Sequence, residues 1–287
     1  MASPASKLHD HVSRIKRPSP LGSTIFVGLR LVEPFLQYAI LGQNLGSALI
    51  TRFGGHVVPL GTPIDNVIGL SPYRLLLLLM SVSCSLKQVF WLLVIGEQEM
   101  PLTKAFPILI GNAVINSVNS FLFIWSFTSA ASGGAQSFSE DGFPPTPLVV
   151  GTVVYVLGTV IEVLSEVQRK RFKDDPRNKG KNYAGGLFSL ARHINYTGHL
   201  LMRAGWALAS SGWIWSGIIA LSTFRDFALR GIPVLDHYCQ SRVRSTHCIM
   251  SAKELLIYTI KPVRGVMDSL QEGRTDPDVP GLILMKK

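Results

Sequence analysis

Long apolar stretches separated by short polar segments dominate the pattern of this 287-residue chain. A helix needs about 20 mostly apolar residues to cross a bilayer, and the pattern predicts five such stretches. They cover residues 24–50, 67–95, 105–127, 147–164 and 200–224, and the fourth helix is expected to project as far as Arg171. The predicted fold is an all-α integral membrane protein, a multi-span helical bundle.

The charges between these stretches predict how the chain crosses the membrane. The N-terminal tail has four Lys or Arg, and residues 169–181 carry seven Lys or Arg against two Asp. Residues 129–146 have no Lys or Arg but contain Glu140 and Asp141. The positive-inside rule then places both basic segments in the cytosol. Because the chain is basic again after residue 224, the last stretch is expected to be a helical hairpin that turns near residues 210–212.

Composition supports a membrane protein and excludes other classes. Only 16% of residues are charged, against roughly 25% in an average soluble domain. The net charge of +10 is concentrated between apolar stretches, which favours a face against anionic lipid over nucleic-acid binding. We expect no obligate protein partner and, in a eukaryote, the endoplasmic reticulum.

Three regions are expected along the chain. Residues 1–22 form a basic cytosolic tail, residues 23–242 a single membrane domain, and residues 243–287 a divergent polar tail. The candidate metal ligands His237, Cys239, His247 and Cys248 lie on either side of the boundary between the last two regions. Their spacing matches no standard zinc pattern, so we expect no metal site.

Several polar residues interrupt the apolar stretches. Arg30 and Glu33 lie one turn apart and can pair inside a bundle, which lowers the cost of burying them. Lys87 is expected to face a cavity rather than lipid. Three asparagines share one face of the third helix, either as interhelical hydrogen-bonding groups or as the polar wall of a cavity: Asn112, Asn116 and Asn119.

Residues 162–198 contain the richest chemistry. Glu162 and Glu166 are one turn apart at the boundary between apolar and basic sequence. A carboxylate inside a membrane is costly, which favours a function for Glu162, whereas Glu166 could equally pair with Arg169 or Lys170 at the interface. The cations and amides that follow suit a phosphate-rich cofactor. A Rossmann glycine motif is absent from the sequence.

The same segment carries a recognisable series of motifs. They are Glu162-x3-Glu166-x-Gln168, Phe172-Lys173, Asn178-x-Gly180-Lys181, Gly186-Leu187-Phe188 and Arg192-His193-x-Asn195-Tyr196-x-Gly198. The series resembles the C-terminal half of the steroid 5-alpha-reductase family, especially its fungal and bacterial branch, over about residues 85–240. That family is related to sterol reductases and isoprenylcysteine methyltransferases.

The resemblance implies a multi-helix membrane reductase with a cytosolic cofactor loop. Such enzymes use NADPH to reduce an activated carbon-carbon double bond, usually of an enone, in a lipidic or sterol-like substrate. An acidic or phenolic group polarises the carbonyl, and Glu162 and Tyr196 are the candidates for this catalytic role. The candidate cofactor-binding residues are Glu166, Lys173, Asn178, Arg192, His193 and Asn195.

Three departures from the family pattern keep other functions open. Ile194 replaces a proline, His199 replaces an acidic residue and could act as a donor, and the tail beyond residue 243 finds no match. A SAM-dependent methyltransferase of the isoprenylcysteine or phospholipid type is one alternative. A non-catalytic protein that retains the fold is the other.

Overall fold

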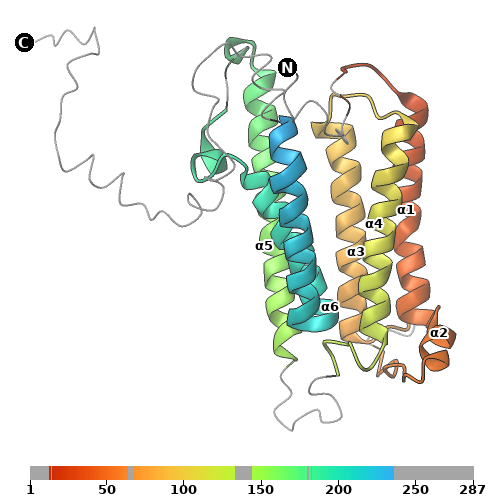
Figure 1. Cartoon of the computed structure of the whole chain (residues 1–287). Coiled ribbons are helices and arrows are strands. Elements are labelled where there is room, and N and C mark those ends of the chain that lie inside the picture. The colour runs from red at the N-terminus through yellow and green to blue at the C-terminus, as the bar shows by residue number, and fades with distance from the viewer. Residues whose placement is uncertain are drawn as a thin grey trace, which may run out of the picture.

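The computed structural model describes residues 13, 15–63, 68–132, 144–179, 181 and 183–235. Glu140, Asp141, the four candidate metal ligands and the polar tail lie outside the described residues. Five described helices are long and apolar enough to cross a membrane. The elements are α1 (Pro20–Gln43), α2 (Ser47–Arg52), α3 (Pro72–Phe90) with the π-helical turn η2 (Trp91–Ile95), α4 (Leu102–Ile124), α5 (Thr146–Asp174), the 3-10 turns η3 (Pro176–Asn178) and η4 (Gly186–Ser189), α6 (Ile194–Asp226) and the π-helical turn η5 (Phe227–Gly231) (Figure 1).

The expected boundaries were wrong at two places. The first span ends at Gln43 rather than near residue 50, because Asn44 adopts a left-handed conformation (φ 54°) and the Leu45 amide closes the helix on the Ala39 carbonyl. The last helix begins at Ile194 rather than near residue 200. Asn195 and Tyr196 therefore lie in the first turn of a helix and not in a loop.

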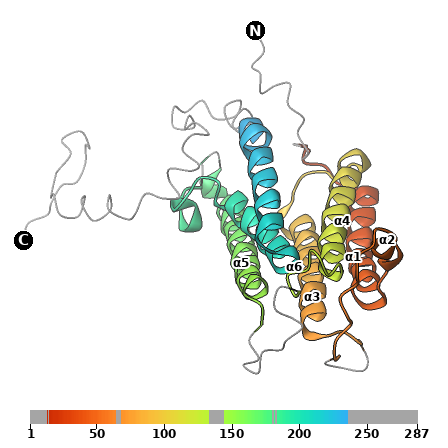
Figure 2. The same ribbon diagram turned by 60° about the horizontal axis from the view of Figure 1, so that its bottom comes forward.

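The expected helical hairpin at the end of the membrane domain is confirmed. Ser211 and Gly212 leave helical geometry inside α6, and Gly212 takes φ 76°. Beyond this break the chain turns back (Figure 2). The Ser216 hydroxyl accordingly donates to the Ala204 carbonyl at 2.9 Å. In a continuous helix these residues would be about 18 Å apart. The hairpin returns residues 213–235 to the end of the bundle where α6 begins.

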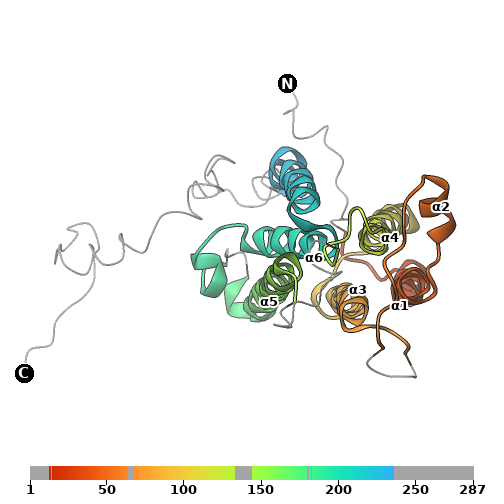
Figure 3. The same ribbon diagram turned by 90° about the horizontal axis from the view of Figure 1, so that it is seen from below.

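The bundle consists of two groups of helices. Viewed along the helix axes, α1, α3 and α4 form one group, and α5 packs on the first half of α6 in the other (Figure 3). The first group shares a buried polar core around Glu33, which confirms the expected pair with Arg30 at 3.5 Å. The Glu33 carboxylate also accepts hydrogen bonds from Gln37, Ser85 and Asn116.

Glycines bring α5 and α6 into backbone contact. Gly151 lies against Gly205, and Gly158 lies against Gly198. A Cβ atom at Gly158 would come within 2.7 Å of the Gly198 carbonyl oxygen, and one at Gly198 within 2.8 Å of the Gly158 oxygen. Small residues allow helices to approach this closely in a membrane, where apolar burial does not drive association. The contact places Glu162, one turn after Gly158, opposite the start of α6.

Both basic segments lie at the same end of the bundle. Lys16 and Lys170 both bind Glu97 in the turn before α4, Lys170 at 2.8 Å. Arg17 binds Glu99 in the same turn at 2.8 Å. Hydrogen bonds from Lys16, the larger effect, and from Lys170 lower the pKa of Glu97 to about 2, so this carboxylate stays ionised. The shared end agrees with the topology expected from charge, and its cytosolic orientation stays a prediction.

Candidate functional site

A cavity of about 180 Å³ lies between the two helix groups. Its walls are largely apolar and aromatic, from Phe26, Phe90, Trp91, Ile95, Met100, Ile108 and Val163. The polar lining residues are Lys87, Gln88, Glu162, Glu166 and His199. Ligand sites commonly combine such apolar walls with a few converging polar groups.

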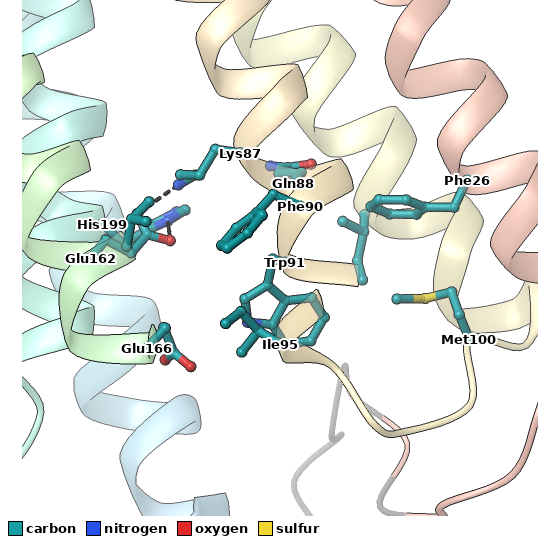
Figure 4. Close-up of a pocket in the computed structure, with 12 residues that line it drawn as sticks. Phe26, Lys87, Gln88, Phe90, Trp91, Ile95, Met100, Glu162, Glu166 and His199 are labelled. Carbon is teal, nitrogen blue, oxygen red and sulfur yellow. Dashed lines mark hydrogen bonds and ion pairs between the residues drawn. The ribbon is translucent and has the colours of Figure 1, made fainter. Parts of the chain in front are cut away.

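Three of these polar residues form one connected cluster. Figure 4 shows Lys87 of α3 reaching toward the adjacent side chains of Glu162 on α5 and His199 on α6. The Lys87 Nζ lies 2.6 Å from Glu162 Oε2, and the His199 Nδ1–H donates to Glu162 Oε1 at 3.2 Å. Because an ionised carboxylate only accepts hydrogen bonds, Lys87 and His199 are the hydrogen-bond donors to Glu162. The cluster confirms the expectation that Lys87 faces a cavity.

A π-helical turn shapes the opposite wall. The Gly96 amide bonds the Trp91 carbonyl at 2.7 Å, which widens the end of α3 over Trp91–Ile95. Trp91 and Ile95 both line the cavity. Turns of this kind are rare and occur frequently at functional sites. Apolar sequence alone carries no signal for such a turn.

The segment after α5 is held against the end of that helix. The Gln168 side chain accepts from the Leu187 amide at 2.9 Å, and the Tyr183 ring packs between Phe172 and Phe188. Gly186 has φ +55°, and a Cβ there would lie 2.4 Å from the Gln168 oxygen. This contact brings together Gln168, Phe172 and the Gly186-Leu187-Phe188 motif.

Glu166 joins the Arg192–Gly198 motif to the cavity wall. It is buried, accepts from Asn195 Nδ2 at 2.8 Å and pairs with Arg169. The expected ion pair with Arg169 is thus present, and Glu166 also lines the cavity, whereas its role in cofactor binding stays a prediction. Asn195 is buried at the helix start and orients this carboxylate.

Tyr196 lies in an aromatic stack beside the cluster. Its ring stacks on His193 at 5.4 Å and on Phe227 at 4.5 Å between centroids. Phe227 in turn contacts the His199 ring edge-on at 5.7 Å. Tyr196 is not among the residues that line the cavity. A catalytic role for its hydroxyl stays a prediction, whereas its packing role is direct.

The remaining candidate cofactor residues, Lys173, Asn178 and Arg192, lie near the C-terminal end of α5. Lys173 and Arg192 are exposed, and Asn178 donates its side-chain amide to the Phe172 carbonyl at 3.1 Å, beyond the last turn of α5. Exposed cations beside hydrogen-bonding amides are the donor set that phosphate and ribose groups require. These residue types fit a phosphate-bearing cofactor, and their binding roles stay predictions.

The asparagines of α4 act as interhelical hydrogen-bonding groups. Asn119 accepts from the Trp215 indole at 2.7 Å, and Asn112 accepts from Gln88 at 2.9 Å. Asn116 accepts from Arg203 at 2.9 Å. None of the three lines the cavity. Arg203 was not among the predicted site residues, although a cation inside an apolar stretch is itself a signal of function.

His193 provides a test by pH. Burial, together with the nearby Arg192 and Arg169 charges, lowers the pKa of His193 to about 4 from 6.5. Between these values the unfolded chain binds a proton that the folded protein does not, so stability falls as the pH drops. We expect the melting temperature to fall from pH 6.5 to pH 4, and to fall less in His193→Phe, which keeps the aromatic stack.

The control for this prediction is His56→Phe, because His56 is exposed. It should retain the pH dependence of the parent. Equal slopes in the parent and in His193→Phe between pH 6.5 and 4 would contradict the assignment of the effect to His193.

The fold and the site together define a multi-pass helical membrane protein with a charged cluster in an internal cavity. A family described as "Protein of unknown function (DUF1295)" matches residues 112–247, and this family falls within the steroid 5-alpha-reductase-like superfamily. A curated relative, the probable O-methyltransferase ustE of Ustilaginoidea virens, is 40% identical over 234 residues, which cover 79% of this chain and 81% of the relative. No solved structure matches the chain.

The chain belongs to the DUF1295 family. The resemblance stated from its motifs is thereby confirmed at the level of the superfamily. Membership of the steroid 5-alpha-reductases themselves stays a prediction.

Proposed function

We propose that this protein is a membrane-embedded, NADPH-dependent reductase of an activated carbon-carbon double bond in a lipidic substrate. The observation that carries the proposal is the Lys87–Glu162–His199 cluster in an apolar cavity, joined through Glu166 and Asn195 to the Arg192–Gly198 motif. NADPH would supply a hydride to the β carbon of an enone. Lys87 would donate a hydrogen bond to the carbonyl oxygen, on which negative charge develops, and the α carbon would then take a proton from water.

The cluster is suited to this chemistry by its charge and surroundings. Glu162 holds the Lys87 ammonium at 2.6 Å and orients the His199 ring, so both side chains are fixed in place before the substrate binds. Preorganised donors aimed at a developing negative charge are worth several kcal/mol in a site that excludes water. Trp91, Phe90 and Phe26 supply apolar walls against which a lipid-like body can pack.

A second candidate function is SAM-dependent O-methylation. The 40% identical relative is named a probable O-methyltransferase, and its activity is proposed here for this chain only as an alternative. The His199–Glu162 pair supports it, because a neutral imidazole held by a carboxylate can accept a proton from a substrate hydroxyl as that oxygen takes the methyl group.

Thermal stabilisation by NADPH, NADH and SAM separates the two functions. A ligand that binds only the folded protein stabilises it by about 2.7 kcal/mol at a hundredfold excess over its Kd. The proposal expects a shift with NADPH and turnover of enones in neutral detergent. A shift with SAM alone would replace it by methyl transfer, and no shift with any of the three would leave the non-catalytic protein as the conclusion.

The variant Arg192→Ala tests whether this arginine binds the phosphate of NADPH. Removing a charge-assisted bond to phosphate costs about 1.5–3 kcal/mol, so Arg192→Ala should bind NADPH at least about tenfold more weakly. Arg52→Ala, which removes an exposed arginine from α2 at the other end of the bundle, is the matched control (Figure 1). Equal NADPH affinity in both variants would remove Arg192 from the cofactor site.

A further inference from the structure

Arg203 is a buried cation that the proposed reaction does not use. It lies on α6 one turn after His199, and its side chain points into the interface with α4. Only 6% of the residue is exposed. A buried charge inside a membrane is costly and is generally retained for a function.

Neutral amides, and not a carboxylate, hold this guanidinium. One nitrogen donates to the Asn116 oxygen at 2.9 Å and the other donates to the Asn112 oxygen. Within the described part of the chain, no carboxylate forms an ion pair with Arg203. Asparagine satisfies the donors of arginine without cancelling its charge, whereas aspartate at either position would neutralise it.

The remaining buried charges around the cavity cancel in pairs. On α1, Arg30 faces Glu33, and the Lys87 ammonium of α3 faces Glu162 of α5. Glu166 of α5 pairs with Arg169, and the α4 side chains that bind Gln88 and Arg203 are neutral amides. Arg203 therefore leaves one positive charge in excess beside His199, before any proton on that ring is counted.

We propose that Arg203 makes the cavity selective for apolar molecules that end in an anionic oxygen. The inference deepens the proposed function and rests on it in placing the substrate in this cavity. A cation near a low-dielectric cavity attracts an anion much more strongly than it would in water. Asn112 and Asn116 position Arg203, and Arg203 acts on the ligand through space rather than by contact.

The test uses dodecanoate, dodecanol and dodecylamine as probes that share one apolar chain and differ in charge. Their binding to the full-length protein in neutral detergent is measured without cofactor, so the result does not depend on NADPH or SAM. We expect dodecanoate to bind about tenfold more tightly than dodecanol, and dodecylamine to bind most weakly.

Two variants remove the excess charge by different routes. Arg203→Met deletes it, and Asn112→Asp neutralises it in place; both should abolish the preference for dodecanoate while dodecanol binding is retained. Arg203→Lys should keep the preference. Asn119→Asp is the matched control, because it adds the same charge on α4 where the partner is Trp215.

Equal binding of dodecanoate and dodecanol to the parent would overturn the inference. So would a preference that survives in Asn112→Asp, which keeps the test decisive even where Arg203→Met does not fold. Loss of the preference in Asn119→Asp as well would overturn it too, because the effect would then follow the total charge and not Arg203. Failure of NADPH to bind would contradict the reductase without changing any of these outcomes.

Discussion

Replacing Glu162 by glutamine is expected to lower turnover by about 100- to 1,000-fold, the loss typical of removing one preorganised donor to a developing negative charge. The substitution keeps the size of the side chain but removes its charge. The Lys87 ammonium then loses its partner at 2.6 Å, and His199 loses the acceptor that orients its ring. The measurement is the steady-state rate with the substrate class that the ligand screen identifies.

A double variant separates catalysis from stability in this prediction. Breaking a buried ion pair on one side is strongly destabilising, by about 3–5 kcal/mol, because the other charge is left unpaired. Lys87→Met combined with Glu162→Gln removes both charges, so its melting temperature should recover relative to the single variant while its turnover stays low. If turnover recovers together with the melting temperature, the pair is structural and not catalytic.

Glu97→Gln is the matched control. Like Glu162, Glu97 is a carboxylate with two partners, in this case Lys16 and Lys170. It does not line the cavity. The same chemical change there should leave turnover close to that of the parent. A loss as large as that of Glu162→Gln would mean that turnover depends on ion pairs in general.

Replacing Gly158 by alanine is expected to destabilise the protein by about 3 kcal/mol, the upper part of the usual range for overpacking. The added Cβ would lie 2.3 Å from the Met202 amide nitrogen and 2.7 Å from the Gly198 carbonyl oxygen. Both are backbone atoms and cannot turn away as a side chain could. The helices must separate, which also moves Glu162 away from His199 and lowers turnover.

The control for Gly158→Ala is Gly217→Ala in the second half of α6. A Cβ at Gly217 meets no atom within 4 Å. Alanine favours a helix over glycine by about 1 kcal/mol, so this variant should be as stable as the parent or slightly more stable. Melting temperatures of both variants in detergent decide the matter. A neutral Gly158→Ala would refute the backbone contact between α5 and α6.

Properties that depend on local sequence were predictable. The apolar stretches predicted the membrane helices, and the basic residue clusters predicted that the N-terminus and the end of α5 share one side. The hairpin in α6 followed from charge, because Arg225 and Arg230 had to return to the basic side. Periodicity also placed Asn112, Asn116 and Asn119 on one face. Each of these follows from helix geometry and from the cost of charge in lipid, which act on neighbouring residues.

Pairing between distant residues was not predictable in the same way. Glu162 could be identified as a costly intramembrane carboxylate, but its bonds to Lys87 and His199 join three helices. The seven-residue spacing of Gly151 with Gly158, and of Gly198 with Gly205, was visible in the sequence, yet nothing local says that these glycines face each other. The uncompensated charge of Arg203 likewise depends on its neutral partners on α4, which are distant in the sequence. Helix formation is decided by each segment and its solvent, whereas the cavity and its charge arise where side chains from separate helices meet, and packing alone brings them together.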